Sequence, residues 1–257
     1  MRFLKTLAAT IIGAAVCVCA GCSQTAPTAT EPAESGNIKA NVETTFNPTV
    51  DSPTIDKTSY IDPMASIIGN VEIAGKVYVA PCASVRGDEG QPVYIGEGSN
   101  VQDGVVLHGL ETEDEGEPVE KNIVDISGKK YSVYVGKNVS LAHQCQIHGP
   151  ASVGDGTFIG MQALVFKAQV GKNCVVEPGA RLLNGVKVAD GHYVPAGTVV
   201  TTQAQADKLP VITDSYPMKD LNKGVLHVNE QLAEGYLGGG GESAAGYETS
   251  TEEPTQH

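Results

Sequence analysis

An aliphatic residue recurs at every sixth position over most of the chain, and this period restricts the fold more than any other feature. The positions are Ile61, Ile67, Ile73, Val79, Val85, then Ile95, Val101, Leu107, then Val135, Leu141, Ile147, Val153, Ile159, Val165, then Val170, Val176, Leu182, then Val188, Val194 and Val200. The fifth place of each hexad is mostly small or β-branched. Two inward positions in every hexad describe a short strand and a tight corner, and three such faces make one coil of a triangular prism. The repeat predicts an all-β chain, a left-handed parallel β-helix over residues 54–201, with a C-terminal α-helix within residues 202–237.

The N-terminal end of the chain lacks this repeat. Arg2 and Lys5 precede an apolar run and small residues, a pattern that predicts an export signal over residues 1–21. The end of this segment resembles a prokaryotic lipoprotein signal, in which the cysteine at the position of Cys22 is lipidated and begins the mature chain. Cys19 stands where an aliphatic residue is usual, so ordinary secretion is the alternative. We expect an exported protein, anchored by lipid to the outer face of the cell membrane or secreted.

Two further segments are predicted to lack a fixed structure. Residues 22–53 are rich in Thr, Pro, Ala and Glu and contain little apolar surface. Such a segment cannot bury enough hydrocarbon to offset the loss of chain entropy, so we expect a disordered tether. The Gly-rich and acidic residues 238–257 are expected to form a flexible tail.

The formal net charge of −13 limits the partners of the protein. It would repel the phosphates of nucleic acid and the head groups of anionic lipid, so membrane contact is expected only through the N-terminal lipid. The partner should be small or neutral. Outside the signal, Cys82, Cys145 and Cys174 are odd in number and cannot all pair within one chain, which leaves the state of Cys82 open.

The stretch SLAHQCQIHGP, residues 140–150, contains two histidines and a cysteine, and the phase of the repeat separates them. Cys145 occupies the fifth place of its hexad, where other hexads carry Ala or Val, so we expect its thiol inside the prism. His108 and His148 each follow an inward residue, so both are expected to point outward. Metal ligands are therefore to be sought among the outward-facing histidines.

The hexads of His108 and His148 begin 40 residues apart, which equals one 18-residue coil plus a 22-residue excursion. The acidic segment 109–132 supplies that excursion. The two histidines are then neighbours on adjacent coils, about 4.8 Å apart along the stacking direction. His143 belongs to the preceding face, so a threefold trimer is needed to bring it to the same ion. Three imidazoles with an open fourth position suit catalytic zinc, which brings the pKa of bound water to about 7.

These residues resemble a known family, the prokaryotic γ-class carbonic anhydrases, especially the secreted archaeal type. The likeness runs from about Pro53 to Tyr236, in the stretches SIIGNVEI, ASVRGDEG, GSNVQDGVVLHGLET, VSLAHQCQIHGPASVGDGTFIGMQALVF and ADKLP. It implies a homotrimeric lyase in which each metal is held by His108 and His148 of one chain and His143 of its neighbour. It also implies that a metal-bound hydroxide attacks CO2 to form bicarbonate. Zn²⁺ is expected, and Fe²⁺ or Co²⁺ would also suit three nitrogen ligands.

The resemblance assigns roles to three amide side chains. Gln102 would hydrogen-bond metal-bound water, and Asn100 and Asn229 would help to place CO2 or bicarbonate. The chain departs from the family pattern two residues before Asn229, where Tyr is familiar and His227 stands here. The polarity of the substrate side is therefore in question at that position.

The resemblance also assigns roles to charged residues. Glu89 would lie on the proton path beside the metal, Glu111 would carry the proton away, and Glu115 would assist it. Interface ion pairs would be formed by Arg86, Asp88 and Asp103. For Arg86 and Asp88, holding the trimer together without touching substrate is the favoured interpretation.

Two functions of other classes share the predicted prism. A hexapeptide-repeat acyltransferase uses one catalytic histidine and an acyl-CoA donor, and export argues against it because acyl-CoA is cytoplasmic. A non-catalytic structural subunit would keep the trimer without the catalytic side chains. The three histidines, together with Gln102 and Glu111, argue against that alternative.

Overall fold

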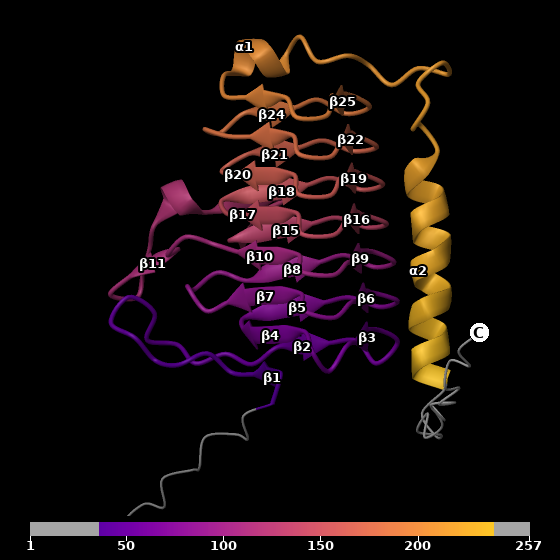
Figure 1. Cartoon of the computed structure of the whole chain (residues 1–257). Coiled ribbons are helices and arrows are strands. Elements are labelled where there is room, and N and C mark those ends of the chain that lie inside the picture. Colours follow the sequence, from indigo (N-terminus) through magenta and orange to yellow (C-terminus); the bar gives the residue numbers. More distant parts are fainter. Residues whose placement is uncertain (1–35, 239–257) are drawn as a thin grey trace, which may run out of the picture. The chain divides into compact units, whose positions relative to one another are not determined.

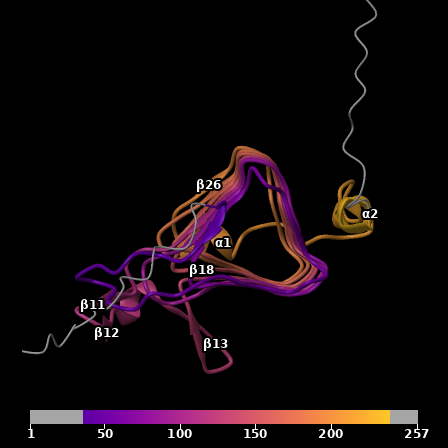
Figure 2. The same cartoon turned by 90° about the horizontal axis from the view of Figure 1, so that it is seen from below.

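The computed structural model describes residues 36–238, which form a prism of stacked coils with one long helix beside it (Figure 1). Viewed along the stack, the coils outline a triangle (Figure 2). The chain is a left-handed parallel β-helix followed by a C-terminal helix, which confirms the predicted fold class. The signal predicted over residues 1–21, Cys22, the tether as far as residue 35 and the tail from residue 239 lie outside the described residues.

Three parallel sheets form the faces of the prism. Face A contains β1 (Ile38–Lys39), β4 (Ser66–Gly69), β7 (Ser84–Gly87), β10 (Val106–His108), β17 (Gln146–His148), β20 (Leu164–Phe166), β23 (Arg181–Leu182) and β26 (Val199–Val200). Face B contains β2 (Thr54–Ile55), β5 (Val71–Ile73), β8 (Val93–Ile95), β15 (Val133–Val135), β18 (Ala151–Val153), β21 (Gln169–Val170) and β24 (Lys187–Val188). Face C contains β3 (Tyr60–Ile61), β6 (Tyr78–Val79), β9 (Asn100–Val101), β16 (Ser140–Leu141), β19 (Phe158–Ile159), β22 (Val175–Val176) and β25 (Tyr193–Val194).

The aliphatic hexad residues fill the inside of the prism. Every one of the predicted series is buried except Ile61, which is half-buried in the first coil. Cys145 and Cys174 lie among them with exposed fractions of 0% and 1%, as the phase of the repeat predicts. Because successive side chains of a strand point to opposite sides, the residue after each buried aliphatic one faces outward. The chemistry of each face is therefore set by these outward residues.

Residues 36–53 differ from the predicted tether, because they are folded against the prism. Strand β1 extends face A by pairing in parallel with β4, with Ile38 opposite Ile67. The loop that follows is closed by Asn41, whose side chain accepts a hydrogen bond from Asp51 N at 2.7 Å and donates to Thr49 O at 2.8 Å. Polar closure and an available strand edge hold this segment, although its apolar content is low.

The acidic excursion between β10 and β15 contains two small hairpins and projects from the prism (Figure 2). The first pairs β11 (Glu113–Asp114) with β12 (Glu117–Pro118), and the second pairs β13 (Val124–Ile126) with β14 (Lys129–Tyr131). A short 3₁₀ turn, η1 (Glu120–Asn122), lies between them. The coils on either side of the excursion still pair in register, since β10 lies between β7 and β17.

Two helices follow the last coil, over the predicted segment 202–237 and one residue beyond it. Helix α1 (Gln203–Ala206) is a single turn whose N-terminus is closed by a capping box between Thr202 and Gln205. Helix α2 (Leu221–Gly238) runs along the prism beside face C (Figures 1 and 2). Within residues 36–238, neither helix has the length and apolar content that crossing a membrane requires.

Candidate metal centre and interface groove

His108 and His148 are paired neighbours on face A. They end strands β10 and β17 and lie directly opposite each other in the register of the two strands, as the count of residues predicts. Their ring centroids are 5.3 Å apart and the rings are nearly perpendicular, at 84°. Both side chains point away from the core, because each follows a fully buried aliphatic residue. The pair therefore presents two imidazoles on the outside of the same two coils.

Three charged side chains converge on one nitrogen of His108. Its Nε2 atom lies 3.2 Å from Asp88 Oδ1 and 3.1 Å from Glu89 Oε1. Arg86 Nη2 also lies 3.2 Å from the same nitrogen, and Arg86 Nε donates to Asp88 Oδ2 at 2.9 Å. An arginine can only donate, whereas the two carboxylates can only accept, so one nitrogen cannot satisfy all three contacts as hydrogen bonds. The convergence of two carboxylates marks a place that favours a positive charge.

The pKa values of these groups reflect that charge pattern. Hydrogen bonds to Asp88 and Glu89 raise the pKa of His108 to about 9, although burial acts in the opposite direction. Burial raises the pKa of Asp88, but hydrogen bonds from His108 and Arg86 outweigh it and bring that pKa to about 2. Burial lowers the pKa of His148, which favours a neutral imidazole with a lone pair available to a cation. Among the described residues, Asp88, Glu89 and His108 form the one compact group of three candidate ligands within a single chain.

His148 and His143 share a further feature of metal-ligating histidines. The Nδ1 atom of His148 lies 3.3 Å from Gly149 O, and the Nδ1 atom of His143 lies 3.0 Å from Asp103 Oδ2. Because a carbonyl and a carboxylate can only accept, Nδ1 is the donor in each case and the lone pair is left on Nε2. A second hydrogen bond of this kind is what orients histidines that bind metal.

His143 does not reach the other two histidines within one chain. It follows β16, at the corner between faces C and A, and its side chain is 51% exposed. Asp103 contacts this imidazole from the neighbouring coil of the same chain, and the interface ion pair expected of Asp103 stays a prediction. The structure therefore separates the predicted ligands into a pair on face A and a single exposed imidazole at the corner.

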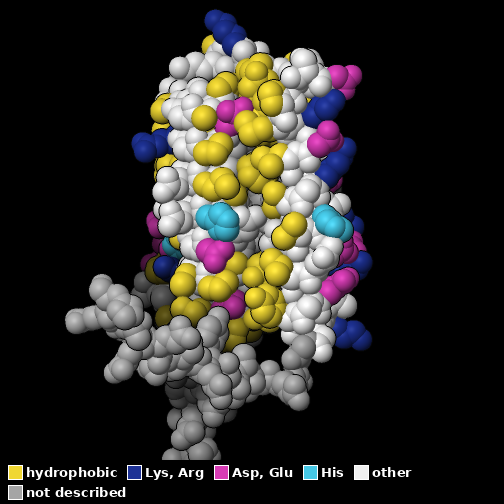
Figure 3. Space-filling model, turned by 45° about the vertical axis from the view of Figure 1, so that its right-hand side comes forward, with side chains coloured by type: hydrophobic (Ala, Val, Ile, Leu, Met, Phe, Trp, Pro, Cys, Tyr) yellow, Lys and Arg dark blue, Asp and Glu magenta, His cyan; other side chains and the backbone are white. Residues whose placement is uncertain are grey.

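A groove of about 610 Å³ lies between helix α2 and face C, beside His143. Figure 3 shows hydrophobic side chains gathered in a band along this side of the molecule. The apolar residues that line the groove are Tyr78, Ala142, Phe158, Met161, Pro178, Met218, Leu221, Val225, Val228 and Leu232. Several of them are exposed although apolar, with Val228 at 55% and Met161 at 43%. The polar groups that line the groove are Gln102, Asp103, His143 and Asn229.

Gln102 and Asn100 form a hydrogen-bonded chain under this groove. Gln102 donates to Asn100 Oδ1 at 3.0 Å, and Asn100 donates to Ser140 Oγ at 2.8 Å. Asn100 is only 1% exposed, so its side chain does not face the groove. Asn100 therefore orients Gln102, and its expected part in placing CO2 or bicarbonate stays a prediction. The sequence did not single out Ser140. The 40-residue spacing that pairs His108 with His148 also places Ser140 opposite Asn100, and could have predicted this contact.

The remaining predicted residues lie around the two sites. Asn229 lies on α2 with 8% of its surface exposed, lines the groove, and donates from its side-chain nitrogen to Val225 O at 2.8 Å. His227 is exposed on the same helix, with Nε2 at 2.8 Å from the amide nitrogen of Gln231. Glu111 and Glu115 are exposed on the excursion. No described contact joins either glutamate to His108.

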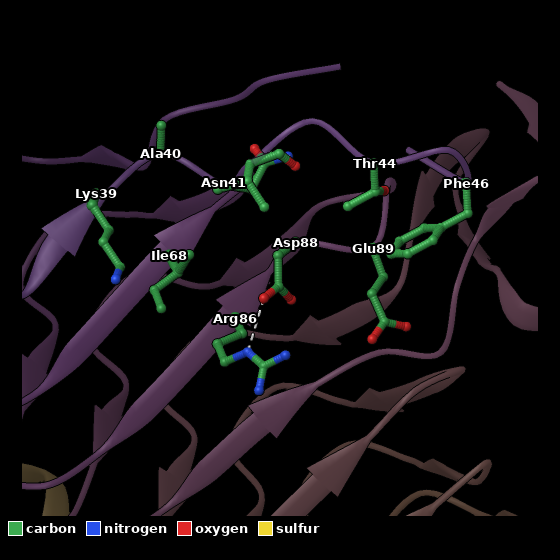
Figure 4. Close-up of a pocket in the computed structure, with 10 residues that line it drawn as sticks. Lys39, Ala40, Asn41, Thr44, Phe46, Ile68, Arg86, Asp88 and Glu89 are labelled. Carbon is green, nitrogen blue, oxygen red and sulfur yellow. Dashed lines mark hydrogen bonds and ion pairs between the residues drawn. The ribbon is translucent and has the colours of Figure 1, made fainter. Parts of the chain in front are cut away.

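The folded N-terminal segment borders the metal site. A cavity of about 270 Å³ lies between this segment and the loop after β7, and Figure 4 shows the residues that line it. In that view a dashed line marks the ion pair of Arg86 and Asp88, and Phe46 and Glu89 also line the cavity. Asn47, which is 1% exposed, donates to Asp88 O at 3.4 Å. The segment predicted as a tether therefore contributes to the surroundings of the candidate centre.

The chain is similar in sequence to several curated proteins and in fold to solved structures. No protein-family model matches the chain. A curated protein described as a carbonic anhydrase, from Methanosarcina thermophila, is 59% identical over 204 residues, which cover 79% of this chain and 82% of that protein. The carboxysome assembly protein CcmM of a Nostoc species is 45% identical over 71% of this chain, but over only 31% of its own length. A crystal structure of a hexapeptide transferase family protein from Anaplasma phagocytophilum has a TM-score of 0.54 and 23% identity, covering 72% of this chain and 93% of that one, and shows the fold alone.

Proposed function

The chain belongs to the γ-class carbonic anhydrases, and we propose that it hydrates CO2 reversibly at metal sites built between the subunits of a homotrimer. The family assignment rests on the identity to the Methanosarcina protein over most of both chains. The single observation that carries the proposed arrangement is the separation of the three histidines. His108 and His148 stand side by side on face A, whereas His143 is exposed at the corner between faces C and A.

The trimer follows from that separation. Of the three predicted imidazole ligands, one chain brings His108 and His148 to one place and leaves His143 apart, and two imidazoles alone hold a divalent ion weakly. In a closed threefold arrangement, the corner of one chain meets face A of the next, so His143 of one subunit completes the site of its neighbour. The exposed apolar groove beside α2 supports this packing, because large exposed apolar surfaces usually mark interfaces.

The residues present fit a metal ion. His143 and His148 both leave Nε2 available, and the carboxylates of Asp88 and Glu89 make the surroundings of His108 Nε2 favourable to a cation. A divalent metal bound there supplies a Lewis acid that lowers the pKa of its bound water to about 7. Three nitrogen donors suit Zn²⁺, which we propose as the ion, and they also suit Fe²⁺ or Co²⁺.

The groove supplies the binding surface for the substrate. CO2 is small and uncharged, so apolar side chains such as Phe158 and Val228 can accept it without loss of hydrogen bonds. The side-chain nitrogen of Gln102 donates to Asn100, and this hydrogen bond fixes the orientation of the Gln102 amide group at the groove. Asn229 adds a second amide on the opposite wall. These two amides are proposed to distinguish bicarbonate from CO2 at the moment of release.

Protons must leave the site after each turnover, and two glutamates are proposed to move them. Glu89 contacts His108 directly and is about one-fifth exposed, at 22%, so it can accept a proton at the site. Glu111 is exposed on the excursion and can release protons to solvent, with Glu115 assisting. Arg86 holds Asp88 beside this path through the 2.9 Å ion pair.

The two alternative functions are not favoured. The similarity to a hexapeptide transferase family protein lies in the shared prism, at 23% identity. A non-catalytic subunit would not need the hydrogen bonds that orient His143 and His148. Export, and a lipid on Cys22, remain predictions from the N-terminal sequence, and release of a Cys22→Ser variant from membranes of the native host would support the anchor.

The proposed function is tested by measuring CO2 hydration with the purified full chain, before and after chelation and after addition of Zn²⁺. We expect activity that a chelator removes and that the ion restores. Sedimentation of the same sample should give a trimer. A metal-free trimer of undiminished activity, or a metal-loaded trimer without activity, would contradict the proposal.

A further inference from the structure

We propose that Thr112 is a positioning residue that holds Glu89 in place beside His108. The inference rests on the proposed function, because it explains how the excursion fixes a carboxylate at the metal site. Thr112 lies on the acidic excursion, next to Glu111, and yet it is completely buried, with 0% exposed. A fully buried hydroxyl next to an exposed glutamate needs a hydrogen-bond partner, and this partner shows what the residue does.

The contacts of Thr112 supply that reason. Its Oγ1 donates to Glu89 O at 2.6 Å and accepts from Gln91 N at 2.6 Å. Its backbone N–H donates to the same Glu89 carbonyl at 2.9 Å. One residue of the excursion therefore binds the backbone on both sides of Gly90. The approach is close, because a Cβ atom on Gly90, which has a φ of +103°, would lie 2.5 Å from Thr112 Oγ1.

The loop that carries Glu89 is held at three successive carbonyl groups. Asn47 donates to Asp88 O at 3.4 Å, Thr112 donates to Glu89 O, and Asn70 donates to Gly90 O at 3.0 Å. The three donors come from the N-terminal segment, the excursion and the preceding coil. Thr112 makes the shortest of these contacts and the only one at the carbonyl of Glu89 itself. The direction in which the Glu89 side chain leaves the backbone is therefore set mainly by Thr112.

Thr112 is itself fixed by the excursion. Val119 N donates to Thr112 O at 2.7 Å, and Asn122 donates to Glu111 O at 2.7 Å. The backbone of the two proposed proton-transfer residues, Glu89 and Glu111, is thus joined by one hydrogen-bonded unit with Thr112 at its centre. The excursion then has two tasks, to carry Glu111 and to hold Glu89 against the 3.1 Å contact with His108 Nε2.

The chain contains a matched control for this hydroxyl. Thr157 is also 0% exposed, and its Oγ1 donates to Gly171 O at 2.8 Å and accepts from Cys174 N at 3.0 Å. It bridges a carbonyl and an amide of the next coil just as Thr112 does, but at a corner between faces B and C. Thr157→Val should therefore have a similar effect on stability without an effect on the metal site.

The test compares Thr112→Val, Thr112→Ser and Thr157→Val in the metal-loaded full chain. We expect Thr112→Val to lower kcat about 10-fold to 100-fold, as loss of an outer hydrogen bond at a metal site does, with a smaller change in kcat/KM. Thr112→Ser keeps the hydroxyl and should retain near-normal kcat, and so should Thr157→Val. Hydrogen exchange should show faster exchange of the Gln91 amide in Thr112→Val alone, which is independent of activity.

A double-mutant cycle shows whether Thr112 acts through Glu89. The double variant Glu89→Ala/Thr112→Val should have nearly the same kcat as Glu89→Ala alone, because the side chain that Thr112 positions is already absent. Full additivity, or equal kcat in Thr112→Val and Thr157→Val, would overturn the positioning role while CO2 hydration by the wild type still supports the proposed function. An inactive wild type would instead reject the proposed function, and faster Gln91 exchange would then still report the contact.

Discussion

Asp103 accepts a hydrogen bond from His143 across two neighbouring coils, with 3.0 Å between the Oδ2 and Nδ1 atoms. Because the carboxylate can only accept, Nδ1 of His143 carries the proton and the lone pair is left on Nε2, in a side chain that is 51% exposed. This contact supports the proposal that His143 is oriented to bind the metal of a neighbouring subunit.

Asp103→Asn should weaken metal binding about 10-fold to 100-fold, because an amide can turn its NH2 group toward Nδ1 and stabilise the wrong tautomer. Competition with a chromophoric chelator measures the affinity. Asp155→Asn is the control, since Asp155 pairs with Lys172 at a different corner. Equal affinities for wild type and Asp103→Asn would show that this hydrogen bond does not orient a ligand.

Each of His108→Ala, His143→Ala and His148→Ala should abolish metal binding, because two imidazoles hold a divalent ion weakly. The informative measurement uses mixed trimers of His143→Ala and His148→Ala chains. If the site spans two subunits, each mixed trimer has one chain with an intact face A followed by one with an intact corner, and so regains one site. Metal analysis and activity of the mixture report that recovery, and its absence would place all ligands within one chain.

Glu111→Ala should lower kcat much more than kcat/KM, because attack on CO2 does not need proton transfer to solvent. A small imidazole-type buffer should restore kcat by carrying the proton. Glu117→Ala, an exposed glutamate of the same excursion, is the matched control and should behave as the wild type. Equal losses in both kinetic parameters, or no response to buffer, would assign Glu111 to binding or structure.

The cysteines should differ in reactivity although none is paired among the described residues. Burial raises the pKa of both Cys145 and Cys174, so neither thiol should react with an alkylating reagent in the native protein. Cys82 is exposed and should react. Peptide mapping by mass spectrometry measures this at each cysteine. Cys145→Ala should also retain full metal content, and loss of metal from a folded trimer would place the thiol at the metal site.

The period of the sequence determined the prism, its core and the sides on which the histidines stand. These properties depend on the alternation of side chains along each strand. This alternation is set by residues that are close in the sequence, so it can be predicted from the sequence. The pairing of His108 with His148 was also predictable. The 40 residues between their hexads, less the 22 residues of the excursion, leave the 18 residues of one coil. The fold of residues 36–53 was not predictable in this way, because its stability comes from the edge of β4 and from Asn41 rather than from its own composition.

The tertiary structure alone decided which polar groups act together. Asn100 accepts a hydrogen bond from Gln102 and donates one to Ser140, which lies 40 residues away in the sequence. Thr112 meets Glu89 only because the excursion folds back over the loop after β7. In an unfolded chain, a polar side chain can form hydrogen bonds with water and with many other polar groups. The periodicity of the sequence does not predict which of these hydrogen bonds forms in the folded chain. Burial in the folded chain removes the water and leaves one partner within reach, which is why these contacts appear only in three dimensions.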